Sequence, residues 1–410
     1  MEHQQIIPHL FRTEYRKLIS VLCRYFGFDQ IELAEDVASE TFLIAAQNWA
    51  ISGLPPNPTA WLYSVAKNKA KNQLQRGKLF DNKIAPEIRE TAATLYAYEP
   101  DLSPQNINDS QLQMMFAICH PAISAEAQVS LALRILCGFG IDEIADAFLT
   151  NKETINKRLY RAKEKLRKDR IKIEMPAEKE IDHRLEQVLT TIYLLFNEGY
   201  YSLSSDTTLR KDLCLEAIRL CTMLVENTQT DKPEVRALLS LMCFHASRFE
   251  ARISKNGELI LYDDQDTSLW DTDLISKGAY FLNCSARGHQ LSRYHLEATI
   301  AYWRTQKLDT PEKWQVVLGL YDQLLQIVCS PIVALNRVYV LSKVAGNRAA
   351  IAEVNKLDLT DNQFYFTLLG YLYTGTDDAQ AMLNFRRALS LARSMADRHI
   401  IQQKIDNLSP

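Results

Sequence analysis

The chain has 410 residues, of which 24% are charged, and its formal net charge is −3. This composition is ordinary for a globular protein with two or three cores, and it excludes a largely disordered chain. The eight cysteines form no CxxC pair, no apolar run reaches 18 residues, and no signal-peptide pattern opens the sequence. We therefore expect a cytoplasmic protein with reduced thiols and no membrane partner.

Helical periodicity dominates, which predicts an all-α fold. In residues 1–78 it predicts three helices, at about 10–26, 31–49 and 58–76. The motif GLPPNPT lies between the second and third of these, and its prolines separate them because proline interrupts a helix.

The second of these helices carries a candidate protein-binding face. Asp36 and Glu40 lie one turn apart, while Val37 and Leu43 fall on another side of the helix. An acidic stripe of this kind suits a basic coiled-coil partner.

The third helix joins an aromatic residue to a polar, cationic surface. Trp61 precedes side chains able to contact nucleic acid, namely Asn68, Lys69, Asn72 and Arg76. An aromatic ring can stack on an unpaired base while neighbouring cations follow the phosphates. The alternative is that Trp61 belongs to the core and the cations form a solvated face.

Residues 79–108 are turn-rich and predict a linker, which would reach roughly 100 Å if fully extended. Residues 109–172 predict a second helical domain. Its last stretch, from Lys152 to Lys172, holds ten cations and three anions, an excess of seven positive charges in a chain that is slightly negative overall. Such clustering is typical of a surface that binds a polyanion.

A short helix, a polar turn at Thr150-Asn151 and a longer helix beginning near Lys152 predict a helix-turn-helix. The longer helix has one apolar stripe, formed by Ile155, Leu159, Ala162 and Leu166. Its polar amino-terminal half carries the candidate DNA-binding residues: Lys152, Thr154, Asn156, Lys157, Arg158 and Arg161. A basic helix packed on a bundle, with no DNA function, is the alternative.

Residues 173–410 predict further helices with a degenerate tetratricopeptide-like pattern, in which the matching positions are Phe366, Leu369, Gly370, Tyr373, Ala381, Phe385 and Ala388. A generic helical bundle is the alternative. The acidic run DDQDTSLWDTD at 263–273 lacks calcium-loop spacing, and we interpret it as a loop before a helix capped by Thr267 or Ser268.

The first domain resembles region 2 of bacterial extracytoplasmic-function (ECF) sigma factors. The resemblance is carried by Ala34-Glu35-Asp36, Glu40, Phe42, Trp49, Gly53-x-Pro55, Asn57-Pro58-x-Ala60-Trp61-Leu62, Ala66-x-Asn68 and Arg76. Gly138–Lys168 resembles region 4 of the same family, and FNEGYYS, QDTSLWD and SPIVALNRV resemble a subgroup with a carboxy-terminal tetratricopeptide-like extension.

The resemblance implies four parts: sigma region 2 (1–78), the linker (79–108), the region 4 helix-turn-helix (109–172) and a tetratricopeptide-like domain (173–410). It implies that core RNA polymerase is a partner, through its β′ clamp coiled coil and β flap, and that promoter DNA is the other.

It also implies a role for each candidate set of residues. The polymerase-binding residues would be Asp36, Val37, Glu40 and Leu43. The −10 element would be bound by Trp61, Asn68, Lys69, Asn72 and Arg76, and the −35 element by Lys152, Thr154, Asn156, Lys157, Arg158 and Arg161. No enzymatic activity, cofactor or metal is expected.

Two departures from the family pattern affect these expectations. Asn72 stands where region 2 often has Asp or Arg, so the −10 preference is expected to be shifted, and Leu-Ser-Arg-Tyr at 291–294 replaces the subgroup's Gly-Pro-Tyr-like helix start. For the extension we expect regulation in cis, by docking within the same chain.

Two rival functions stay open. One is a one-component helix-turn-helix regulator with a helical sensor domain, and the other is an enzyme housed in residues 181–410. The first leaves the motifs of residues 33–76 unexplained.

Overall fold

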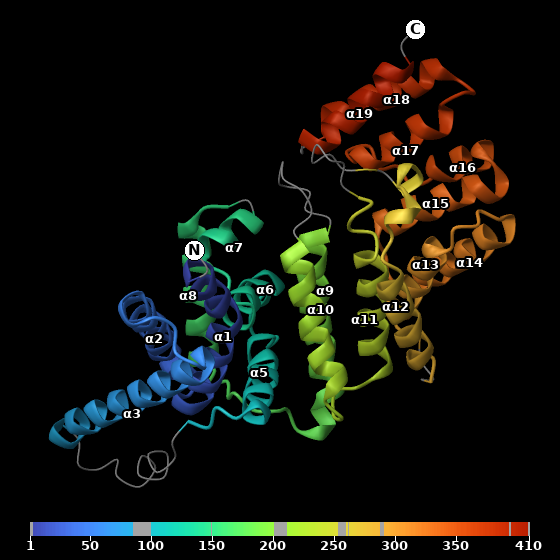
Figure 1. Cartoon of the computed structure of the whole chain (residues 1–410). Helices are drawn as coiled ribbons and strands as arrows, with labels where there is room; N and C mark the ends of the chain where they lie inside the picture. Colours follow the sequence, from blue (N-terminus) through green and yellow to red (C-terminus); the bar gives the residue numbers. More distant parts are fainter. Residues whose placement is uncertain are drawn as a thin grey trace. The chain divides into compact units, whose positions relative to one another are not determined.

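The computed structural model (Figure 1) has helices as its only regular elements among the residues that it describes, which confirms the expected all-α fold. The chain divides into two compact units, residues 1–194 and 195–410, and each is described by itself. The residues described are 3–84, 100–148, 150–200, 211–252, 260, 262–287, 291–392 and 395–408.

The first unit is built from helices on both sides of the predicted linker. In chain order they are α1 (His3–Phe26), η1 (Phe28–Gln30), α2 (Ile31–Ser52), α3 (Pro58–Ile84), α5 (Pro104–Ile118), α6 (Ala125–Leu131), η2 (Ala132–Leu136, a π-helical turn), α7 (Ile141–Ala147), α8 (Lys152–Lys168) and the first part of α9 (Glu178–Tyr200).

The break between α2 and α3 lies at the predicted proline motif. α2 ends at Gly53, whose φ of 78° is a left-handed conformation that glycine adopts without strain. Asn57 then caps α3, because its side chain accepts a hydrogen bond of 3.0 Å from the amide of Ala60. α3 continues through residues 79–84, which the sequence had assigned to the linker, and residues 85–99 of that linker lie outside the described part of the chain.

α8 has the beginning and the buried face that the sequence predicts. Asn151 caps it by accepting a hydrogen bond of 2.8 Å from the amide of Thr154. Its buried residues are the predicted stripe: Ile155, Leu159, Ala162 and Leu166. This stripe faces α6 and α7, so the rest of the helix surface points away from them.

α1 holds the first unit together. It contacts α2 and α3, and it also contacts α5 and η2 from beyond the linker (Figure 1). Leu18, Ile19 and Leu22 on α1 are fully buried. The amino-terminal helices α1–α3 and the segment α5–α8 therefore share one core instead of forming two independent domains.

The second unit comprises the end of α9 and the helices that follow it. They are α10 (Lys211–Glu226), α11 (Pro233–Ala246), η3 (Tyr262–Asp264), η4 (Thr267–Leu269), α12 (Thr272–Ser285), α13 (Arg293–Thr305), α14 (Pro311–Ile327), α15 (Pro331–Ala345), α16 (Asn347–Val354), α17 (Gln363–Tyr373), α18 (Asp378–Leu391) and α19 (Met395–Leu408).

From α10 onward, successive α-helices of this unit pack on one another. α17 and α18 approach closely at Gly370, where an added Cβ would lie 2.6 Å from the Phe385 ring. The prediction of a helix capped by Thr267 or Ser268 was wrong. Asp266 caps η4 and Asp271 caps α12, because each carboxylate accepts a hydrogen bond from a backbone amide two or three residues ahead.

Candidate functional site

The acidic stripe on α2 is open to solvent. Asp36 and Glu40 are both exposed, and Leu43, one turn further on, is 57% exposed. Val37 is only 1% exposed, so it supports the helix from inside the core and is not part of this surface. Glu40 also accepts a hydrogen bond of 2.5 Å from Lys69 of α3, which joins a predicted polymerase residue to a predicted DNA residue.

The aromatic residue near the start of α3 packs against a neighbouring ring but is only partly buried. Trp61 is half-buried, and its ring lies 5.3 Å from that of Trp49 in an edge-to-face contact. Asn68 and Asn72 are exposed on the same helix. The side chain of Arg76 lies outside the described residues. Trp61 is therefore neither fully buried nor fully exposed, and base stacking by its ring stays a prediction.

A hydrogen bond that sequence reasoning missed fixes α3 against α1. The Tyr63 hydroxyl donates to the Glu14 carboxylate at 2.5 Å, although the two residues are 49 positions apart. Burial, followed by this contact with Glu14, raises the pKa of Tyr63 well above its ordinary value. The phenol therefore stays protonated and able to donate this hydrogen bond, which ties α3 to α1.

The outer face of α8 carries the predicted DNA-binding residues. Five of the six are exposed: Lys152, Thr154, Asn156, Lys157 and Arg161. Because the buried stripe occupies one face, these side chains are distributed over the part of the helix surface that is open to solvent.

The sixth residue, Arg158, is half-buried and held in place by its neighbours. Its guanidinium lies 3.4 Å from the Glu126 carboxylate, 3.4 Å from the Ser130 hydroxyl and 5.1 Å from the centre of the Phe148 ring. These contacts fix the position of the charge, but they also give Arg158 an internal partner in the free protein.

Two carboxylates of α2 face α8, which no sequence pattern had indicated. Glu35 lies 2.5 Å from the Lys163 ammonium and 3.4 Å from the Arg134 guanidinium. Glu32 lies 2.6 Å from Arg167. Glu35 had been noted only within the motif Ala34-Glu35-Asp36, and its partners are at least 99 positions away in sequence, beyond the reach of helical periodicity.

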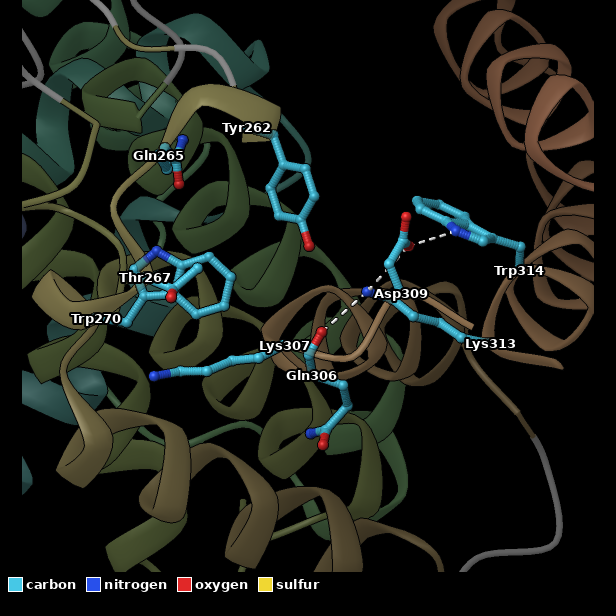
Figure 2. Close-up of a pocket in the computed structure, with 9 residues that line it drawn as sticks. All are labelled: Tyr262, Gln265, Thr267, Trp270, Gln306, Lys307, Asp309, Lys313 and Trp314. Carbon is cyan, nitrogen blue, oxygen red and sulfur yellow. Dashed lines mark hydrogen bonds and ion pairs between the residues drawn. The ribbon is translucent and has the colours of Figure 1, made fainter. Parts of the chain in front are cut away.

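The second unit contains a pocket of about 140 Å³ between η3–η4 and the turn joining α13 to α14 (Figure 2). Asp309 accepts a hydrogen bond of 2.5 Å from the Trp314 indole, and the Lys313 ammonium donates to the Gln306 carbonyl at 2.9 Å. These side chains are thus partnered, whereas Gln265 Oε1 and Trp270 Nε1 of the same lining are buried with no hydrogen-bond partner among the described residues. The described part of the chain has no cluster of three side chains able to hold a metal ion.

Two family comparisons match different parts of the chain. Sigma-70 region 2 matches residues 10–79, which contain the α2 and α3 surfaces described above. A family of unknown function (DUF6596) matches residues 184–286, in the second half. Among the described residues, no helix combines the length and apolar character needed to cross a membrane.

A whole-length relative also exists. The chain is 32% identical over 400 residues to "Uncharacterized protein R00370" of Rhizobium meliloti (strain 1021), which covers 95% of this chain and 93% of the relative. No solved structure matches the chain. The relatedness to R00370 thus extends through both compact units, and the region 2 match covers most of α1–α3 in the first of them.

Region 2 is the part of a sigma factor that engages both core polymerase and promoter DNA, and sigma factors carry out no bond chemistry of their own. The chain belongs to the same family as R00370 and is a sigma-70 family factor, a non-enzymatic transcription initiation factor that binds core RNA polymerase and promoter DNA.

Proposed function

We propose that the protein is a cytoplasmic ECF-type sigma factor that reads the −10 element with α3 and the −35 element with α8. In this role α2 docks on the β′ clamp coiled coil through Asp36, Glu40 and Leu43, and the α5–α8 segment lies near the β flap. The carboxy-terminal helices, a tetratricopeptide-like domain, regulate these contacts in cis.

One observation supports this proposal most directly. α8 buries a complete apolar stripe and leaves a polar, cationic face open, behind a short helix and a polar turn. A solvated basic helix would explain the charge, but it would not explain why the exposed set also includes Thr154 and Asn156 in the first turns, where a recognition helix meets base edges.

The physics of promoter recognition suits two such surfaces on one chain. Each alone would bind DNA weakly, because phosphate contacts dominate its affinity and salt weakens them. Mounting both on one polymerase raises the effective concentration of the second contact once the first has formed. Binding energy alone drives the process, so no nucleotide site is needed.

Run-off transcription tests the proposal. Core polymerase and a library of genomic fragments would be transcribed with and without the purified protein, and specific transcripts should appear only when it is present. The variant Asp36→Asn/Glu40→Gln should lose co-elution with core polymerase. Asp29→Asn, which removes an exposed carboxylate just before α2, is the matched control and should retain it.

The same assay distinguishes a sigma factor from the rival function, a one-component regulator. A one-component regulator would bind duplex DNA tightly without polymerase and would yield no new transcripts. That outcome would overturn the sigma assignment of the DNA-binding surfaces.

Removal of the carboxy-terminal helices tests regulation in cis. The position of the cut matters, because α9 completes the first unit before it enters the second. Thr191 on α9 donates a hydrogen bond of 2.9 Å to Gln128, and Arg184 donates one of 2.5 Å to the Phe116 carbonyl. A chain ending at residue 200 keeps these contacts. Unchanged transcription and unchanged regulation by this chain would remove the proposed role.

A further inference from the structure

Two tryptophans line the pocket of the second unit, and they differ in how their indole nitrogens are satisfied. Trp270 and Trp314 are each 5% exposed. The Trp314 indole donates to Asp309 at 2.5 Å, whereas Trp270 Nε1 is buried and meets no acceptor among the described residues. A buried donor without a partner is unfavourable, because it has lost its hydrogen bonds to water and has gained none in return.

A buried acceptor lies on the same wall of the pocket. Gln265 Oε1 has no hydrogen-bond partner within the described part of the chain. The amide nitrogen of Gln265 donates to the Ile260 carbonyl at 3.3 Å, which leaves the oxygen as the atom available to the pocket. Figure 2 shows Gln265 and Trp270 on one side of the pocket, across from Asp309 and Trp314. This wall therefore offers one donor and one acceptor.

An unpartnered indole is not by itself a binding site. Trp49 of the first unit also has a buried nitrogen with no partner among the described residues. At Trp270 three features coincide: a donor, an acceptor on the same wall, and a cavity that both residues line.

The cavity is larger than one bridging water requires. Its volume of about 140 Å³ is roughly ten times the space that a single water needs, and it is close to that of an engineered protein cavity that takes up benzene. A molecule with one five- or six-membered ring therefore fits this space.

The opposite wall is held in place by its own contacts. Lys313 is 4% exposed, donates to the Gln306 carbonyl at 2.9 Å and lies 4.0 Å from Asp309. The Tyr262 hydroxyl donates to the Arg304 carbonyl at 2.6 Å, which ties η3 to α13. Side chains that are fixed in this way lose little freedom when a ligand binds, so the free energy cost of ordering them is small.

The unpartnered pair on the η3–η4 wall favours a ligand with hydroxyl groups. A carboxylate offers only acceptors and would leave Gln265 Oε1 unpartnered, while an ammonium offers only donors and would leave Trp270 Nε1 unpartnered. A hydroxyl both donates and accepts. Lys307 and Asp309 also line the pocket and are both exposed, so charges of both signs meet at its edge and neither sign of ligand charge is clearly favoured.

We propose that this pocket binds a small uncharged molecule with several hydroxyl groups, of the size of a single sugar ring, whose hydroxyls accept from Trp270 Nε1 and donate to Gln265 Oε1. The carbon atoms of the ligand pack against the aromatic side chains of the lining. The site lies within the second unit and its binding does not depend on the proposed sigma function, so it can be measured without polymerase or DNA.

Ligand-observed NMR with the full-length protein tests the site and its chemistry. The hydroxylated probes are D-ribose, D-glucose and myo-inositol, and the charged comparison probes are succinate and inorganic phosphate. We expect saturable binding of at least one hydroxylated probe at millimolar concentration, and none of the charged probes. Binding of the charged probes alone would overturn the assigned ligand class. No saturable binding of any probe would overturn the site and leave ordered water as the partner of both atoms.

Replacing the unpartnered donor tests its role. Trp270→Phe keeps an aromatic ring and removes the indole N–H, so it should weaken binding of the probe by about fivefold, the value of one ordinary hydrogen bond. Trp49→Phe makes the same chemical change at the other unpartnered indole and is the matched control, which should bind as the wild type does. Equal affinity of the wild type and Trp270→Phe would show that the probe binds elsewhere.

Replacing the acceptor gives an independent test on the same wall. Gln265→Leu removes Oε1 and keeps a side chain of similar size, and it should weaken binding by a similar factor. Circular dichroism would confirm that each variant keeps its helicity, and if one of them does not fold, the other still removes one of the two predicted hydrogen bonds. Unchanged affinity in a folded Gln265→Leu would contradict the proposed contact with Gln265.

Discussion

The two compact units are held together in different ways. In the first, ion pairs join segments far apart in sequence, and the carboxylate of Glu35 lies between Lys163 and Arg134. In the second, the ion pairs that join different described helices have at least one well-exposed partner, and helices also meet through close apolar contacts, as where the ring of Phe385 packs against Gly370.

This difference indicates that the ion-paired contacts of the first unit can rearrange more readily than the packed contacts of the second. Charges can exchange partners with a polymerase surface or with DNA phosphates, and the exchange depends on salt. A packed ring has no such alternative partner, since moving it opens a void that nothing fills. Both units have a buried apolar core, so we expect exchangeable contacts at the Glu35 ion pairs of the first unit, and mainly effects on stability where a buried ring such as that of Phe385 is changed.

The largest effect is expected from a substitution that creates a cavity in the second unit. Phe385→Ala should lower the free energy of unfolding by about 3–5 kcal/mol, because a ring that is 3% exposed is removed from between α17 and α18. Equilibrium denaturation followed by circular dichroism would measure the loss. Leu383→Ala, two residues away on the same helix and 62% exposed, should change stability by less than about 0.5 kcal/mol.

The same variant also tests the separation of the two units. N-ethylmaleimide alkylation of Cys23, which is buried in the first unit, would report on that unit. If Phe385→Ala increased this alkylation under conditions in which circular dichroism shows the protein folded, the two units would not be distinct in stability and the comparison would fail.

The next largest effect is expected on DNA binding, from removal of an exposed cation of α8. Arg161→Ala should weaken binding of promoter DNA by the holoenzyme by about 1–3 kcal/mol if Arg161 contacts a base edge, and should reduce discrimination among −35 sequences. Lys168→Ala, at the exposed carboxy-terminal end of α8, is the control. Fluorescence anisotropy at two salt concentrations would check both. An equal loss for all sequences would assign Arg161 to phosphate contact alone.

Much of this organisation could be predicted from local sequence. The stripe of α8, its start after Asn151 and the proline break before α3 follow from periodicity and backbone chemistry, which act over a few residues. The solvent exposure of Asp36 and Glu40 could also be inferred, because the other side of their helix is apolar and therefore packs into the core.

What could not be predicted depends on tertiary contacts. Glu35 and Asp36 are neighbours with the same chemistry, yet one faces α8 and the other faces solvent. Val37, expected at the polymerase surface, lies in the core for the same reason, since a helix turns by about 100° per residue and the neighbouring helices decide which side is covered. The caps at Asp266 and Asp271 were missed because five aspartates offered several equivalent choices.

A buried histidine gives the second unit its own dependence on pH. Burial, followed by the charges of Arg248, Arg252 and Arg304, lowers the pKa of His245 well below its ordinary value. The unfolded chain therefore binds a proton near pH 6.5 that the folded chain does not. Stability should fall as the pH drops below about 6.5, by at most about 1.4 kcal/mol per pH unit from this residue.

The matched variants isolate this contribution. His245→Asn should flatten the slope of stability against pH between about 6.5 and 5.5, measured by denaturant titration at each pH. His183→Asn, at an exposed position on α9, should leave the slope as in the wild type. Burial is also the main cause of the lowered pKa values of His120 and His295, so these two residues should still contribute to the pH dependence of stability in the His245→Asn variant. A slope unaffected by His245→Asn would contradict this assignment.

The smallest effect should come from the exposed end of α2, where the charges are not enclosed. The side chain of Glu40 is 49% exposed and pairs only with Lys69 among the described residues, so Glu40→Gln should change the free energy of unfolding by less than about 1 kcal/mol. Denaturant unfolding of the free protein would measure this. In the proposed function Glu40 contacts polymerase and Lys69 contacts DNA. We therefore expect each side chain to exchange this ion pair for its new partner at little cost in free energy. A cost well above 1 kcal/mol would mean that the Glu40–Lys69 pair contributes to the fold of the free protein, as the Glu35 pairs do.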